Sequence, residues 1–184
     1  MYDRNRNEGR GSIGNYHDTT TFAVRAIRRW WEFMGQPSYP YATSLLITAD
    51  RGDSNGARVR LWKWVLQQFA DRTGLTLTVC PFPPRTSKWN WIERRLFSHI
   101  AINWRGKPLV SLAVIISMIG ATTSTTGLRV RSELDKGYPH SVKVSDAHMG
   151  RVLLEPHKFH GGWNYTIRPH RALAKGISYS VAAP

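Results

Sequence analysis

The sequence is poor in cysteine, poor in acidic residues and free of long apolar runs. Cys80 is the single cysteine in 184 residues, which excludes a disulfide-stapled scaffold and a zinc site built from cysteines. The longest apolar stretch, residues 108–121, contains Ser111 and Ser117 and is shorter than the ~20 residues of a membrane-spanning helix. The N-terminal residues are polar and charged where a secretory signal needs an apolar run. These features predict a cytoplasmic protein with no membrane partner.

The shortage of acid leaves the chain strongly basic. It has 26 lysines plus arginines against 12 aspartates plus glutamates, a formal net charge of +14 at pH 7. Hydrophobic residues make up 41%, so the chain is not a disordered basic tail, and its length suits one domain with its own core. The charge favours an anionic partner, with nucleic acid first. A ribosome-like or merely basic protein is the alternative on charge alone.

Strands and helices alternate along the chain, which favours an α/β fold with a mixed or parallel sheet. Turn residues predict a hairpin or a frayed start over residues 2–14. Apolar spacing then predicts a helix that Asp18 or Thr19 caps and that Gly35 and Pro37 end. Consecutive apolar residues predict a strand over 44–50, buried on both faces. Beyond it the pattern predicts a helix over 57–72, a strand over 75–82, helices over 87–104 and 109–121, and short pieces after 127 with one helical turn near Asp146.

Asp50 is the first candidate for chemistry. It ends the expected buried strand and precedes a turn and a helix. Open α/β sheets place their ligands at this position, outside the carboxyl ends of the strands. The alternative is an ordinary turn or cap residue, because aspartate is common in both roles.

Glu93 is the second candidate. At ~100° per residue, it falls in the middle of an apolar stripe formed by Trp89, Phe97, Ile100 and Trp104. A carboxylate on a buried face is costly unless a cation compensates it. That cation is either a metal ion or one of the many arginines and lysines. Two carboxylates on neighbouring elements favour Mg²⁺ or Mn²⁺, which bind hard oxygen ligands, and hence two-metal phosphoryl chemistry on nucleic acid.

Basic and aromatic residues surround Glu93. The basic ones are Arg85, Lys88, Arg94 and Arg95. Trp91 lies opposite the apolar stripe, which makes it the candidate to stack on a base, whereas the stripe predicts that Trp89 and Trp104 belong to the core. The alternative is a solvated basic face above core tryptophans.

The segment LLITADRGDSNGARVRLWKWVLQQFADRTGLTLTVCPFPPRTSKWNWIERRLFSHI resembles the catalytic core of insertion-sequence DDE transposases, in particular the Rhodopirellula-type transposase DDE domain. The blocks YHDTTTFAVRAIRRWW, NWRGKPLVS, ATTSTTGLRVRSELD and FHGGWNYTI extend the resemblance to residues 2–167 in order. The resemblance implies an RNase H-like, mixed five-stranded sheet flanked by helices, and three acids that bind two Mg²⁺ ions. Asp50 matches the second acid and Glu93 the third, while Asn90 and Lys88 match polar residues beside it. The resemblance thus adds Asn90 to the residues expected at the DNA.

The chain also departs from the family's pattern. The family's first aspartate lies on a central strand upstream of any segment present here, and Asp3, Glu8 and Asp18 sit in no buried-strand pattern. Pro81 stands where the family usually has histidine, and Arg85 where it has glycine. We therefore expect an N-terminally truncated chain that lacks the first central strand.

The resemblance and the departures from it lead to expectations about the domain boundaries, activity and stability of the chain. Residues 1–167 form the C-terminal portion of a DDE catalytic domain and residues 168–184 a tail. The intact enzyme cleaves and joins DNA phosphodiesters with two Mg²⁺ ions, and this chain alone is inactive because the first aspartate is missing. The sheet edges left open predict marginal stability or association with another chain, such as a homo-oligomer. The alternative function is that of a catalytically dead, basic DNA-binding remnant.

Overall fold

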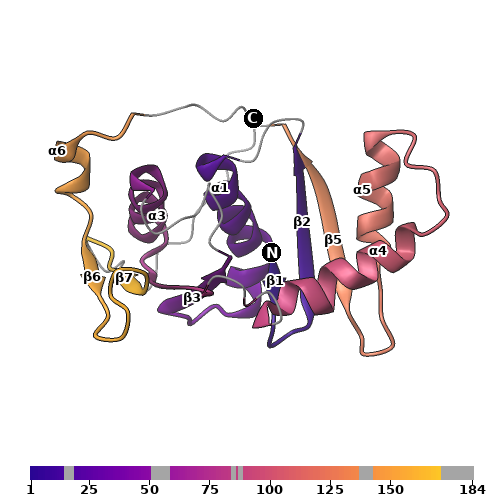
Figure 1. Ribbon diagram of the computed structural model, residues 1–184, viewed down its shortest axis with the longest axis horizontal. Helices are drawn as coiled ribbons and strands as arrows, with labels where there is room; N and C mark the ends of the chain where they lie inside the picture. Colours follow the sequence, from indigo (N-terminus) through magenta and orange to yellow (C-terminus); the bar gives the residue numbers. More distant parts are fainter. Residues whose placement is uncertain (15–18, 51–58, 84–85, 87–88, 137–142, 171–184) are drawn as a thin grey trace.

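The computed structural model describes residues 1–14, 19–50, 59–83, 86, 89–136 and 143–170. In these residues the strands form two separate mixed sheets with helices packed on them, ordered β1-β2-β5 and β3-β4-β7-β6. Figure 1 shows α1 standing between α3 on one side and β2 on the other. The α/β class is confirmed, and the RNase H-like arrangement stays a prediction.

The first sheet begins with the expected hairpin. β1 (Tyr2–Asp3) pairs antiparallel with β2 (Glu8–Gly14), and β2 pairs parallel with β5 (Arg129–Asp135). A Cβ on Gly9 would lie 2.6 Å from Leu96 Cδ1, so the absence of a side chain there lets the sheet approach the helices that cover it. One face of this sheet therefore belongs to a small apolar core. The buried members of that core are Leu96, Ile100, Ile119, Leu128 and Val130.

The other face of this sheet is polar and meets α1 (Thr20–Trp30) through ion pairs. Glu133 binds both Arg10, at 2.5 Å, and Arg29. Arg25 binds Asp135 at 3.0 Å, and the Asp135 side chain has no exposed surface. Burial of charge is costly unless partners compensate it, so these pairs fix how α1 lies on the sheet.

The second sheet carries the larger core. β3 (Ser44–Ala49) pairs parallel with β4 (Thr76–Pro81), which pairs antiparallel with β7 (Tyr165–Ile167), and β7 pairs antiparallel with β6 (Leu154–Pro156). α3 (Arg60–Thr73) and α1 pack on it. The buried residues include Trp30, Trp62, Leu66, Phe69, Leu77, Val79, Tyr165 and Ile167. Within this core Trp62 Nε1 donates to the Tyr165 hydroxyl at 2.8 Å.

The helices of residues 93–120 lie on the outer side of the first sheet, whereas a short helix at residues 146–149 lies beside α3 (Figure 1). A π-helical stretch, η3 (Glu93–Phe97), continues directly into α4 (Ser98–Trp104), and α5 (Leu112–Gly120) follows. α6 (Asp146–Met149) confirms the expected single turn near Asp146. No helix in the described ranges is long and apolar enough to cross a membrane.

Two expectations about these elements need correction. The first helix does not end at Gly35, because it continues as η1 (Trp31–Gly35) and α2 (Gln36–Ser38), with Pro37 in the first turn of α2. The backbone of Gly35 is itself helical and Gln36 N–H donates to the Trp31 carbonyl, so the three segments form one continuous run that ends at Ser38. Thr19 is the cap, as expected, and its side chain accepts from Phe22 N at 3.2 Å. Asp18, the other expected cap, lies outside the described residues.

The expectation that the strand over residues 44–50 is buried on both faces is wrong. In β3 only Ile47 is buried, and Leu46 is 62% exposed. The reason is position: β3 is the terminal strand of its sheet and pairs, in the described ranges, with β4 alone. An exposed edge with an apolar side chain is a template for pairing with another strand.

We predict that the protein self-associates through this edge and that Leu46→Lys weakens the association, because a charge on an edge strand opposes strand pairing. Sedimentation velocity over a range of protein concentrations measures the self-association. Val110→Lys is the matched control, since Val110 is 78% exposed outside any strand. Equal association of the two variants would contradict the role of this edge.

Candidate metal and nucleic-acid site

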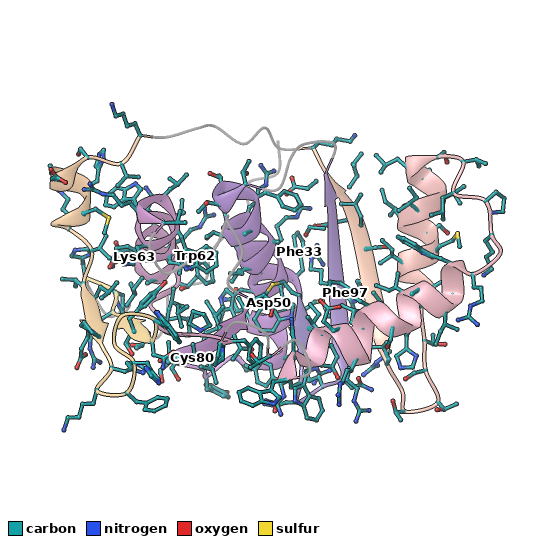
Figure 2. The ribbon with its side chains drawn as sticks, in the orientation of Figure 1. Phe33, Asp50, Trp62, Lys63, Cys80 and Phe97 are labelled. Carbon is teal, nitrogen blue, oxygen red and sulfur yellow. The ribbon has the colours of Figure 1, made fainter. Side chains whose placement is uncertain are left out.

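Asp50 lies immediately after β3 and its side chain is exposed. Figure 2 shows it near the middle of the molecule. Its Oδ2 accepts a hydrogen bond of 2.8 Å from Asn90 Nδ2. The sequence-based position at the end of a strand is therefore confirmed, and one carboxylate oxygen is already oriented.

Asn90 connects Asp50 to the helix that carries Glu93. It is 7% exposed. Its Oδ1 accepts from Ile92 N at 3.3 Å and its carbonyl from Glu93 N at 3.2 Å. Asparagine is a favoured residue just before a helix, because its side chain satisfies an otherwise unpaired N–H. The same side chain thus starts the helix and binds Asp50, which brings two segments that are distant in sequence together.

Glu93 is exposed, so the expectation that it lies inside a buried apolar stripe is wrong. Of the expected stripe, Ile100 is buried together with Leu96, whereas Phe97 is 46% exposed. The wheel assumed 3.6 residues per turn, whereas residues 93–97 are a π-helix with a wider turn. The carboxylate therefore needs no buried counter-charge, and it is accessible to an ion or a ligand from solvent.

Trp91 is 43% exposed and is flanked by two guanidinium groups. The guanidinium carbon of Arg4 lies 4.4 Å from the centre of its ring, and that of Arg95 lies 5.3 Å away. Arg4 comes from the turn of the first hairpin, so sequence reasoning did not find it: a long-range contact leaves no local signal. The nearby Tyr2 has its pKa raised by burial, although Arg95 and Arg4 favour the ionised form.

The other expected contact residues have mixed outcomes. Arg94 is exposed. Trp89 is 60% exposed rather than part of the core, because it precedes the helix, which begins at Trp91. Trp104 is partly buried against the small core, as expected. Arg85 and Lys88 lie outside the described residues.

Asp50 and Glu93 are carboxylates, the donors that Mg²⁺ and Mn²⁺ prefer, and both are exposed. Asn90 contacts both residues, through the Asp50 carboxylate and the Glu93 backbone N–H. In the part of the chain that the structure describes, there is no group of three or more His, Cys, Asp or Glu that could hold a metal ion. The two residues fit a metal site as part of its ligand set, and the set needs oxygen atoms from elsewhere to complete it.

The family of the chain follows from comparison with known proteins. No curated protein and no solved structure matches the chain. A sequence model of the Rhodopirellula transposase DDE domain matches residues 1–169. The resemblance read from the residues is thereby confirmed, and the chain belongs to the Rhodopirellula-type DDE transposase family.

Proposed function

We propose that this domain acts in DNA transposition, in which the intact enzyme cleaves and joins DNA phosphodiesters. The observation that supports the proposal best is the hydrogen bond from Asn90 to Asp50, because Asn90 also starts the helix of Glu93. This linkage connects the segment of Asp50 to the helix that carries the exposed Glu93, in a strongly basic protein of a transposase family. A carboxylate pair on an anion-attracting surface is suited to metal-assisted chemistry on phosphates.

Each residue of the site has a proposed role. Asp50 and Glu93 would hold Mg²⁺ or Mn²⁺, which supplies charge stabilisation for phosphoryl transfer and activates water at neutral pH. Asn90 positions Asp50 with respect to the helix. Arg85, Lys88 and Arg94 bind DNA phosphates, which fixes the register of the strand without reading its sequence.

We also propose that the 184-residue chain is inactive when assayed alone. Two carboxylates give a metal pair fewer negative ligands than the three acids that the family resemblance implies. No third candidate stands beside them in the described residues. Nicking of plasmid DNA that requires Mg²⁺ and disappears in Asp50→Ala would contradict this proposal.

A second candidate function is DNA binding without catalysis. The observation in its favour is that Arg4, Arg94 and Arg95 have no ion-pair partner in the described part of the chain, whereas most other described arginines have one. Such arginines bind phosphate whether or not a metal is present. Co-assembly with catalytically active transposase chains would then be the route by which the chain acts.

Metal-coupled DNA binding separates the two functions. We predict that Mn²⁺, at constant ionic strength, raises the affinity of the wild-type chain for duplex DNA several-fold, because a bound ion neutralises the carboxylates beside the phosphates. The double variant Asp50→Asn/Glu93→Gln should bind DNA at least as well without metal and gain nothing from Mn²⁺. Fluorescence anisotropy titrations give both numbers.

The control replaces a carboxylate pair away from the site. Asp146 and Glu155 bind Arg60 and Arg168 and are exposed. Asp146→Asn/Glu155→Gln should respond to Mn²⁺ as the wild type does. The same Mn²⁺ response in all three proteins would contradict the metal role of Asp50 and Glu93 and favour the binding-only function.

A further inference from the structure

The cluster of Arg4, Trp91 and Arg95 combines an exposed aromatic ring with two cations. A guanidinium near the face of a tryptophan is attracted to its ring electrons, so the two arginines hold the ring in a defined orientation. Trp91 remains 43% exposed beside these two groups. A large, oriented and accessible ring is a surface on which another flat group can stack.

Charge at this cluster is uncompensated. Arg4 and Arg95 converge on one ring, and the exposed Arg94 directly precedes Arg95 in the chain. In the described ranges none of the three has a carboxylate within ion-pair distance. Elsewhere Arg10, Arg25 and Arg29 all do. Like charges brought together in this way favour binding of an anion.

The cluster lies next to the carboxylates. Trp91 directly follows Asn90, whose side chain binds Asp50 at 2.8 Å. Trp91 also precedes Glu93 by two residues, within the same helical stretch. A ligand on Trp91 would thus place its neighbouring phosphates beside the proposed metal ligands.

We propose that Arg4, Trp91 and Arg95 form a binding site for one unpaired nucleotide of DNA, with the base stacked on the aromatic–guanidinium surface and its phosphates on the arginines. This inference rests on the proposed function, since it names the state of the DNA at the same site. A paired base hides both faces in the duplex, so a stacking surface selects an unpaired one. Stacking on tryptophan and on guanidinium planes accepts any base, because every base has a π-face.

The test compares single-stranded and duplex DNA. Binding of a short labelled oligo-dT strand and of a duplex of equal length is measured by anisotropy, in EDTA and at fixed salt. Trp91→Leu is expected to weaken single-strand binding about tenfold, the effect of one lost base stack, and to change duplex binding less than about twofold. Trp91→Phe should keep most of the affinity, because it keeps an aromatic face.

Arg4 has its own variant and control. Arg4→Ala should weaken single-strand binding and lower the salt dependence by about one ion. Arg105→Ala, which removes an equally exposed arginine from the end of α4, should leave the preference for single strands unchanged. Phe159→Ala, at a side chain that is 73% exposed on another surface, should change neither affinity.

Two results would overturn the proposal. One is an equal loss of single-strand and duplex binding in Trp91→Leu, which would mean that the cluster holds phosphates only. The other is unchanged binding in both Trp91→Leu and Arg4→Ala. The metal-free assay separates this proposal from the metal function: Asp50→Asn/Glu93→Gln should retain the preference for single strands whether or not the chain uses metal.

Discussion

Replacing Asn90 by alanine is expected to weaken Mn²⁺ binding at the Asp50–Glu93 site by about 10–100-fold, the usual effect of losing a partner that orients a ligand. Asn90 Nδ2 donates to Asp50, and Asn90 Oδ1 accepts from Ile92 N at the start of the helix. Without the amide, Asp50 is free to rotate and the helix loses its cap. Electron paramagnetic resonance titration of free Mn²⁺ measures the affinity.

The stability cost of Asn90→Ala should be much smaller than its effect on metal binding. Loss of a helix cap costs about 1 kcal/mol, which chemical denaturation measures. Thr19→Ala removes the cap of α1 and is the matched control: it should cost similar stability and leave Mn²⁺ affinity unchanged. A similar loss of Mn²⁺ affinity in both variants would contradict a specific role of Asn90.

The second large effect concerns Glu133. Glu133→Gln is expected to destabilise the fold by about 2–3 kcal/mol, because Glu133 is only 26% exposed and its loss leaves the charge of the buried Arg10 uncompensated. Arg10 binds Glu133 at 2.5 Å with only 6% of its side chain exposed, and Arg29 binds the same carboxylate. Glu155→Gln is the control, since Glu155 and Arg168 are 61% and 60% exposed and exposed pairs contribute at most about 1 kcal/mol. Equal losses in the two variants would contradict the structural role of Glu133.

Acid should destabilise the protein through the same residue. Burial favours the neutral form of Glu133, but hydrogen bonds from Arg29 and Arg10 outweigh burial and lower its pKa below the usual 4.5. A lowered pKa means that the unfolded chain binds more protons, so this contribution is fully present above pH ~4.5 and is lost as the pH falls through the folded-state pKa. Thermal melts between pH 3 and 7 should show this loss in the wild type and a smaller one in Glu133→Gln. An equal fall of melting temperature with pH in the two proteins would contradict this role of Glu133.

Local sequence patterns predicted the features that depend on local chemistry. Asp50 at the end of a strand, Thr19 as a helix cap and the alternation of β4 follow from turn chemistry, capping and period. Each of these depends on a few adjacent residues, so one sequence suffices to predict it. The same holds for the short helix at Asp146, which Ser145 caps.

Features that depend on distant contacts were not predictable. The exposure of Glu93 depends on a π-helical turn that no residue pattern signals, and that of Trp89 on a helix that begins two residues after it. The exposure of Leu46 depends on which strand lies beside β3. Arg4 joins the site only because the first hairpin lies near the helix of Trp91. Resemblance to the family identified Asn90, but its bond to Asp50 needed the structure.

The central claim is that Asp50 and Glu93 bind one divalent ion together. The most direct test is paramagnetic broadening by Mn²⁺ in an amide ¹⁵N–¹H spectrum of the full chain, which detects weak binding. Amides around Asp50 and around residues 90–93 should broaden first. Asp50→Asn and Glu93→Gln should each abolish the broadening at both segments. Broadening that begins elsewhere, or that persists at Glu93 in Asp50→Asn, would contradict the claim.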